Sequence, residues 1–157
     1  MDKVFWLHPN VIAGRTGPNK DFWEPKELAK GGIGAVLSVN SGEGANPGDL
    51  ADAGIRYACV PLSDAAPPQP GDFAICTAAL PQALDFALRS IDSGKSLLVH
   101  CTSGKDRTAM FLSYYLCKTE GLAPAEAIQA VKQVRPIALT AKGWEALTLQ
   151  VLDALGA

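Results

Sequence analysis

The stretch from residue 96 to residue 108 constrains this chain more than any other. Leu97, Leu98 and Val99 form an apolar run that is typical of a buried strand. A short polar loop with one glycine follows, and an apolar segment that ends at Gly121 predicts a helix. Because a strand, a tight loop and a helix come in this order, the loop and the positive end of the helix can surround an anion together. We therefore expect an α/β fold with an anion site at the carboxyl end of this strand.

Two reactive side chains, Cys101 and Arg107, stand at the two ends of this predicted loop. The backbone N–H groups of residues 102–107 can point inward, and their field favours the ionised thiolate of Cys101, which is a nucleophile. Arg107 offers a planar pair of donors that suits two oxygens of a phosphoryl group. The stretch therefore predicts a phosphate-binding loop that contains a nucleophile. The alternative is a buried thiol beside an ordinary solvated turn.

The sequence HCTSGKDRT over residues 100–108 resembles the His-Cys-x5-Arg-Ser/Thr signature of cysteine-dependent protein tyrosine and dual-specificity phosphatases. The resemblance extends from Trp6 to the last predicted helix and is strongest to the small atypical, VHZ-like members. It implies one phosphatase domain over residues 1–157 with a dual-specificity-phosphatase-like fold. It also implies a phosphomonoester hydrolase that acts through a cysteinyl-phosphate intermediate.

Hydrophobic periodicity predicts one α/β domain, with a central, mostly parallel sheet and helices on both faces. The chain of 157 residues is long enough for one such domain. A proline at position 81 is expected either to kink or to divide the longest helix. The predicted strands cover residues 4–7, 11–14, 33–39, 55–61 and 96–100, and the predicted helices cover residues 23–30, 73–93, 108–120, 123–134 and 141–155.

Composition restricts the partners and the setting of the protein. The formal net charge of −2 gives no reason to expect binding to nucleic acid or to an anionic membrane. The four cysteines show no metal-ligand spacing and fit a reducing compartment, so we expect no metal, no cofactor and a cytoplasmic protein. No signal peptide and no apolar run long enough to span a membrane are found in the sequence. We expect a monomer whose partner is a phosphorylated protein or a small phosphomonoester.

A general acid is needed to protonate the departing oxygen, and three aspartates compete for this role. The sequence VPLSD over residues 60–64 resembles the apolar-Pro-x-x-Asp pattern with which dual-specificity phosphatases present their acid, so Asp64 is preferred. Asp72 precedes a predicted helix and is typical of an N-cap. Asp106 lies inside the loop, where Gly-x-Asp-Arg-Thr resembles myotubularin-like lipid phosphatases; its alternative role is to brace the loop.

The resemblance also assigns roles to the other residues of the signature. Thr108 is expected to donate a hydrogen bond to the Cys101 sulfur and to ease its departure from the phosphoenzyme. His100 is expected to fix the geometry of the loop. Lys105 is expected on the rim of the site, where it either meets a second phosphate or is solvated. The substrate-binding residues are expected to be His100, Thr102, Ser103, Gly104, Lys105 and Asp106.

Trp144 departs from the family pattern, because it stands where related phosphatases often carry a glutamine that positions the hydrolytic water. The ordinary role of such an aromatic residue on a terminal helix is core packing.

The sequence favours phosphotyrosine over inositol phosphates or phosphoinositides as the substrate, because no cluster of several Lys or Arg residues is found in it. Against this order, residues 104–108 resemble the loop of bacterial tyrosine phosphatases that also accept phosphoinositides. Lys105 and Arg15 could each contact a second phosphate if their loops lie together. Rival interpretations are a phosphate-binding module without catalysis, and sulfur transfer or arsenate reduction with Cys59 as the resolving thiol.

Overall fold

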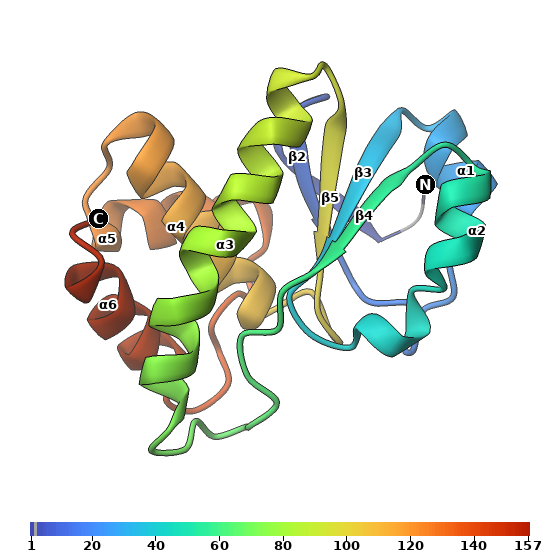
Figure 1. Cartoon of the computed structure of the whole chain (residues 1–157). Coiled ribbons are helices and arrows are strands. Elements are labelled where there is room, and N and C mark those ends of the chain that lie inside the picture. The colour runs from blue at the N-terminus through green and yellow to red at the C-terminus, as the bar shows by residue number, and fades with distance from the viewer. Residues whose placement is uncertain (2) are drawn as a thin grey trace.

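The computed structural model describes residue 1 and residues 3–157, apart from the side chain of Glu43. A five-stranded sheet with the order β1-β2-β5-β3-β4 forms its centre (Figure 1). The pairs β2–β5, β5–β3 and β3–β4 are parallel, and β1 is antiparallel to β2. The prediction of a mostly parallel sheet is confirmed. The strands are β1 (Val4–His8), β2 (Ile12–Arg15), β3 (Ile33–Ser38), β4 (Arg56–Cys59) and β5 (Ser96–His100).

Helices cover both faces of this sheet, as the sequence predicted (Figure 1). Two short helices lie on one face, around a cluster of buried residues that includes Trp23 and Leu50. The four longer helices lie on the other face around the larger cluster. The first group is α1 (Pro25–Lys30) and α2 (Pro47–Asp52), with a 3-10 turn, η1 (Gly42–Gly44), before α2; the second is α3 (Asp72–Asp92), α4 (Arg107–Glu120), α5 (Pro124–Val134) and α6 (Trp144–Ala154).

The register of the strands brings several connecting loops to one edge of the sheet. Arg15 at the end of β2 and Ser38 at the end of β3 both lie opposite His100 at the end of β5. Cys59 at the end of β4 lies opposite Ser38. Because β1 runs antiparallel to β2 and Val4 pairs with Arg15, the segment before β1 also reaches this edge. The carboxyl edge of the sheet therefore gathers loops from five parts of the chain, which is where α/β folds place ligands.

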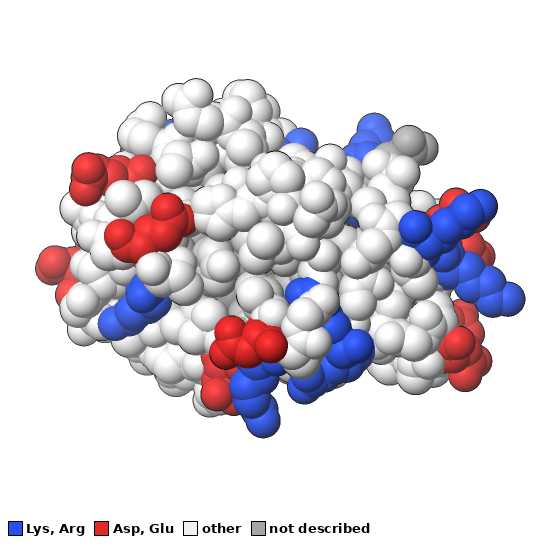
Figure 2. Space-filling model, turned by 90° about the horizontal axis from the view of Figure 1, so that it is seen from above, with Lys and Arg blue, Asp and Glu red and all other residues white. Residues whose placement is uncertain are grey.

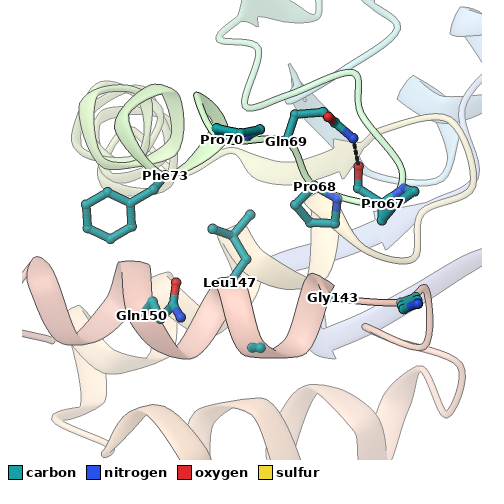
Figure 3. Close-up of a pocket in the computed structure, with 10 residues that line it drawn as sticks. Pro67, Pro68, Gln69, Pro70, Phe73, Gly143, Leu147 and Gln150 are labelled. Atoms are coloured by element: carbon teal, nitrogen blue, oxygen red, sulfur yellow. Dashed lines mark hydrogen bonds between the residues drawn. The ribbon is translucent and has the colours of Figure 1, made fainter.

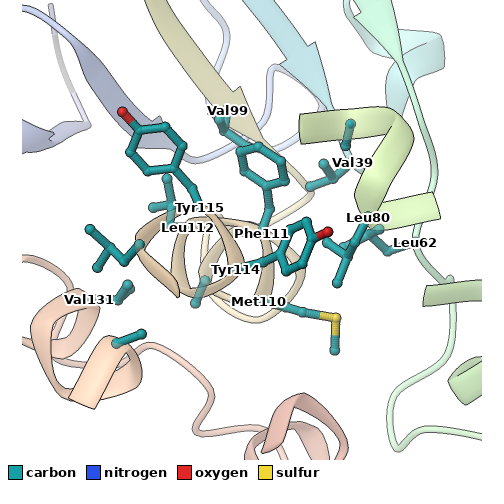
Figure 4. Packing of buried hydrophobic residues seen from close by; sticks show 14 of the residues in the cluster. Val39, Leu62, Leu80, Val99, Met110, Phe111, Leu112, Tyr114, Tyr115 and Val131 are labelled. Atoms are coloured by element: carbon teal, nitrogen blue, oxygen red, sulfur yellow. The ribbon is translucent and has the colours of Figure 1, made fainter. Parts of the chain in front are cut away.

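Helix α4 is the central element of the larger core, because every residue from Arg107 to Cys117 is buried. Phe111 points toward Val99 of β5 and Val39 beyond β3 (Figure 4). The apolar residues of α4 surround the whole helix, as expected for a helix packed between a sheet and other helices. This packing fixes the start of α4, where the sequence places Arg107.

The structure corrects some boundaries that the sequence predicted. β4 ends at Cys59 instead of residue 61, although the Val60 and Leu62 N–H groups still donate to the carbonyls of Ser38 and Val39 at 2.8 and 3.0 Å. α3 continues through Pro81, so the proline does not divide it. α6 begins at residue 144 instead of 141. No helix of the described residues is long and apolar enough to cross a membrane.

Candidate active site

The loop from Cys101 to Arg107 runs from the end of β5 to the start of α4, as the sequence predicted. Gly104 has a φ of +62°, which a residue with a side chain adopts only at an energetic cost. A Cβ atom at Gly104 would also lie 2.5 Å from the Arg15 carbonyl oxygen. Gly17 is packed as closely, since a Cβ atom there would overlap the Cys101 carbonyl oxygen. The two glycines let the loop after β2 press against the loop after β5.

The carbonyl groups of the loop are bound from its outer side. Gly17 N–H donates to the Thr102 carbonyl at 3.0 Å. Arg135 donates from Nη2 to the Ser103 carbonyl at 2.7 Å and from Nε to the Gly104 carbonyl at 3.2 Å. In a trans peptide the C=O and the next N–H point in opposite directions, so the following N–H groups face the inside of the loop. This is the arrangement of an anion cradle.

Thr108 lies where its expected role requires it. Its Oγ1 donates a hydrogen bond to Cys101 Sγ at 3.1 Å, and both residues are buried. A hydroxyl donor at this distance stabilises a thiolate more than a thiol, because the thiolate is the stronger acceptor. The hydrogen bond can therefore support both the attack of the sulfur and its departure.

His100 is held by partners on two sides. Its Nδ1 lies 3.0 Å from the Cys101 carbonyl oxygen, and a carbonyl only accepts, so the proton is assigned to Nδ1. Nε2 then accepts from Ser38 Oγ at 2.5 Å, and Ser38 in turn accepts from the Tyr57 hydroxyl at 2.7 Å. The Trp23 ring meets the imidazole edge-on with 4.9 Å between centroids. Sequence reasoning missed Ser38 and Tyr57, because they come from neighbouring strands and lie in no motif.

Arg107 connects the cradle to the loop that carries Asp64. Its Nε donates to the Ser63 carbonyl, and its Nη2 donates to the Ala65 carbonyl at 3.0 Å. The two hydrogen bonds therefore fix the backbone on both sides of Asp64. The guanidinium also lies 4.8 Å from the ring centre of Trp144, which is fully buried. Trp144 thus packs in the core and supports Arg107.

The three candidate acids occupy different environments. Asp64 is exposed on the loop held by Arg107. Asp72 is buried as the first residue of α3 and accepts from the Gln69 N–H at 2.6 Å; the N-cap is Gly71, which corrects the expectation for Asp72. Asp106 is buried and accepts from the Ala141 N–H at 3.4 Å, as its bracing alternative requires. Of the three carboxylates, Asp64 is thus the exposed one, and Arg107 binds the carbonyls of the residues on both sides of it.

Two possibilities that the sequence left open are not supported by the geometry at this edge. Arg15 is buried and donates from Nη1 to the carbonyls of Thr16 at 2.7 Å and Asp21 at 2.8 Å, so it organises its own loop instead of standing at the rim. Cys59 ends β4, which is separated from β5 by β3. Two strand spacings amount to roughly 10 Å, which is beyond the reach of a disulfide to Cys101 without backbone movement.

Cys76 is a buried thiol in α3 behind the site, with its Sγ 3.8 Å from the Leu62 carbonyl oxygen. Burial, aided by the negative charge of Asp72 and opposed by Arg107, raises the pKa of the Cys76 thiol to about 12. This thiol is therefore protonated at neutral pH. Among the described residues no group of three or more His, Cys, Asp or Glu side chains is placed to hold a metal ion.

Two pockets concern the site, and only the second of them is lined by residues of the loop from Cys101 to Arg107. One, of about 460 Å³, lies between the proline-rich segment after Asp64 and α6, where Pro68 and Phe73 face Leu147 (Figure 3). The other, of about 350 Å³, is bordered by four cations together with Ser103 of the loop. The sequence shows no basic cluster, but the fold assembles one from separate segments. The cations are Lys3, Lys20, Lys105 and Arg135.

Residues 17–149 match the model of the dual specificity phosphatase catalytic domain. Dual specificity protein phosphatase 12 of Mus musculus is 30% identical over 133 residues, which cover 85% of this chain and 37% of that protein. The phosphatidylglycerophosphate phosphatase PTPMT1 of Arabidopsis thaliana is 33% identical over 76 residues, which cover 48% of this chain and 23% of that protein. The chain thus spans less than two fifths of the length of these curated relatives.

Solved structures show the same fold. Human DUSP28 has a TM-score of 0.75 at 24% identity, over 100% of this chain and 97% of that chain. PTPMT1 in complex with PI(5)P has a TM-score of 0.77 at 16% identity, over 99% of this chain and 97% of that chain. The family model, the curated relatives and the fold agree, and they confirm the resemblance of the loop signature. The chain belongs to the dual specificity phosphatase family.

Proposed function

We propose that this chain hydrolyses phosphate monoesters in two steps at Cys101. In the first step the thiolate attacks phosphorus, the bond from phosphorus to the leaving oxygen breaks, and Asp64 gives that oxygen a proton. The product of this step is a cysteinyl-phosphate. In the second step Asp64 takes a proton from water, the water oxygen attacks phosphorus, and the sulfur leaves as a thiolate that accepts the Thr108 hydrogen bond.

The cradle and Arg107 stabilise the charge on the transferred phosphoryl group in both steps. The inward N–H groups of the loop and further N–H groups of the guanidinium can each bind a non-bridging oxygen. Arg107 also positions the acid relative to the nucleophile, because it donates hydrogen bonds to the carbonyls on both sides of Asp64.

One observation carries this proposal: the hydroxyl of Thr108 donates to Cys101 Sγ at 3.1 Å inside a loop whose carbonyls are bound from outside. A phosphate-binding module without catalysis needs the cradle, but it does not need a donor aimed at the sulfur. The hydrogen bond therefore favours a nucleophilic cysteine over passive recognition.

The test is incubation of the protein with p-nitrophenyl phosphate in the presence of a chelator and without a thiol donor. A phosphatase of this type releases nitrophenol, because neither a metal nor a reductant takes part. A binding module releases none, and neither does a sulfur transferase or an arsenate reductase. Binding of phosphate without nitrophenol release would contradict the proposal.

Protein phosphotyrosine and small phosphomonoesters are the first class of substrate that we propose. The family supports this class. Inositol phosphates and phosphoinositides are the second class. They gain support from the basic pocket, because the preference for phosphotyrosine rested on the lack of a basic cluster. Action as a cytoplasmic monomer stays a prediction.

A further inference from the structure

Gly104 is the one glycine of the loop between Cys101 and Arg107. Glycine lacks the Cβ atom that restricts backbone rotation, so the peptide groups on its two sides turn more easily than the others of the loop. The fold requires a glycine here, because a Cβ atom would lie 2.5 Å from the Arg15 carbonyl oxygen. The close packing of the two loops therefore leaves the cradle with a point at which its N–H groups can turn away from an anion.

Arg135 binds the two peptide groups that flank this glycine. Its Nη2 donates to the Ser103 carbonyl at 2.7 Å, and its Nε donates to the Gly104 carbonyl at 3.2 Å. Because the C=O and the following N–H of a trans peptide point in opposite directions, these contacts direct the N–H groups of Gly104 and Lys105 toward the inside of the loop. One guanidinium thus fixes both peptide groups at the point where the backbone is least restrained.

The neighbouring carbonyls of the loop are bound by backbone groups. The Gly17 N–H donates to the Thr102 carbonyl at 3.0 Å, and the Leu139 N–H donates to the Lys105 carbonyl at 3.4 Å. All four carbonyls of residues 102–105 therefore have a partner on the outer side of the loop, and Arg135 supplies two of the four contacts. Because these two come from a side chain, a substitution can remove them.

Arg135 is itself held in place from two sides. It directly follows α5, and its N–H donates to the Val131 carbonyl at 2.9 Å. The guanidinium lies 5.3 Å from the ring centre of Phe5 in β1, within the range of a cation–π contact. A planar guanidinium held in this way can bind two neighbouring carbonyls at once, whereas the ammonium group of a lysine is a compact charge on a flexible stem.

We propose that Arg135 is a positioning residue of the reaction, which keeps the N–H groups of Gly104 and Lys105 directed at the phosphoryl group through its hydrogen bonds to the outer side of the loop. The inference rests on the proposed phosphatase function and adds to it a residue outside the signature. In this role Arg135 contacts the backbone of the loop and not the phosphate. The role needs the paired donors of the guanidinium, and its charge alone does not fulfil it.

Two substitutions separate the paired donors from the charge. Arg135→Lys keeps the charge but loses the planar pair of donors, and Arg135→Met removes both. The matched controls are Arg56→Lys and Arg56→Met, because Arg56 also lies over a phenylalanine ring, 5.6 Å from the ring centre of Phe86. Arg56 begins β4, so it lies at the amino edge of the parallel strands, opposite the loop. Figure 2 views this edge, where charged side chains stand in small separate groups.

The experiment measures binding and turnover separately in the intact chain. Calorimetric titration with vanadate gives the affinity of the cradle without turnover. Steady-state kinetics give kcat and KM for p-nitrophenyl phosphate and for an alkyl phosphate, and urea unfolding shows that each variant is folded under the assay conditions. The ratio of the two kcat values reports the acid, and it should stay unchanged in the Arg135 variants because Arg107 holds the loop of Asp64.

The expected result is that kcat and vanadate affinity both fall by ~10–10²-fold in Arg135→Lys and in Arg135→Met. Loss of one oxyanion donor costs ~10²–10³-fold in kcat, and the effect here is smaller because the N–H groups are misdirected for part of the time and not removed. A residue that only attracts the anion by its charge would raise KM, leave kcat unchanged and be replaced by lysine. The Arg56 variants should keep both quantities.

Values of kcat and vanadate affinity within about threefold of the unaltered chain in Arg135→Lys would overturn the inference, because the charge would then be sufficient. Equal losses in the Arg56 variants, or a changed ratio of the two substrates, would overturn it as well. If Arg135→Met does not fold, Arg135→Lys alone gives the answer. Vanadate binding by an unaltered chain that does not hydrolyse p-nitrophenyl phosphate would contradict the proposed function, while the titration would still test the contacts of Arg135 with the loop.

Discussion

Cys101 is positioned through two of its groups at once. His100 donates to its carbonyl, and Thr108 donates to its sulfur at 3.1 Å. The carbonyl also has Gly17 packed directly against it. Cys101 is therefore positioned by contacts from its own strand, from α4 and from the loop after β2, and Arg107 holds the carbonyls of the residues on both sides of Asp64.

The substitution Asp64→Asn tests the acid. Because the amide cannot protonate an alkoxide, kcat for alkyl phosphates should fall by ~10²–10⁴. The rate on p-nitrophenyl phosphate should fall less, because its leaving group hardly needs a proton. Steady-state kinetics on both substrates make the comparison, with Asp72→Asn as the control. The same pattern in Asp106→Asn, with none in Asp64→Asn, would show that the acid lies inside the loop.

The substitution Gly17→Ala tests the close approach of the two loops. A Cβ atom at this position overlaps the Cys101 carbonyl oxygen, so the loop must shift at a cost of about 1–3 kcal/mol in unfolding free energy. The rate on p-nitrophenyl phosphate should fall with it. Gly48→Ala is the matched control, because nothing lies within 4 Å of a Cβ atom there. Urea unfolding and kinetics measure both effects; equal behaviour of the two variants would refute the contact.

At the scale of elements, α6 supports the site without belonging to the signature. Its first residue, Trp144, places its ring 4.8 Å from the Arg107 guanidinium, and the indole Nε1 has no hydrogen-bond partner among the described residues. The ring therefore supports Arg107 through the cation–π contact of its face and through the core volume that it fills. The cation–π contact holds the guanidinium where it donates to the loop that carries Asp64.

Exchange of Trp144 separates the ring face from the apolar volume. Trp144→Phe keeps an aromatic face and loses no hydrogen bond, so kcat/KM should stay within about threefold. Trp144→Leu keeps apolar packing but removes the face, and kcat/KM should fall by about tenfold, as expected for a cation–π contact of 1–2 kcal/mol out of water. Thermal unfolding of both variants serves as the control for stability. Equal kcat/KM in the two variants would show that Arg107 does not depend on the ring.

The elements that sequence reasoning predicted well are those with a strong local pattern. The apolar run of residues 97–99, the loop of residues 101–106 and the buried helix α4 follow from neighbouring residues, and the structure has them in the predicted places. The end of α3 was also marked locally, by Gly94. Boundaries at prolines were less certain, because Pro81 is tolerated inside α3.

The parts of the site that the sequence did not reveal come from tertiary contacts. Ser38 and Tyr57 contact His100 only because β5, β3 and β4 are neighbours. Arg135 directly follows α5 and donates to the Ser103 carbonyl of the loop, and no local sequence pattern marks it. Arg15 shows the reverse case. Its charge suggests a residue at the surface, but its side chain is buried and donates hydrogen bonds to backbone carbonyls.

At the scale of the whole molecule, the large core contains several acids that burial keeps protonated. Burial raises the pKa of Cys76 from 9.0 to about 12, and it raises the pKa values of Cys117, Tyr114 and Tyr115 as well. All four groups lie on α3 and α4. The folded state therefore holds these protons more tightly than the unfolded state.

The sign of the pH dependence follows from this difference. The contribution to stability is complete below the unfolded pKa of the thiols, near 9, and it is lost as the pH rises toward the folded values. The free energy of unfolding should fall between pH 8 and pH 10, by on the order of 1 kcal/mol from Cys76 alone. Urea unfolding at the two pH values measures it. A free energy that stays constant or rises over this range would contradict the burial of these groups.

In the proposed reaction Cys101 carries the phosphoryl group between the two steps. The most direct measurement is rapid acid quenching during turnover of p-nitrophenyl phosphate, followed by mass spectrometry of the peptide that contains residues 100–108. We expect a phosphate adduct on Cys101. Cys101→Ser should show neither adduct nor turnover, while its vanadate affinity stays within about tenfold because the backbone cradle survives. Turnover by Cys101→Ser, or an adduct on any other residue, would show that Cys101 is not the nucleophile.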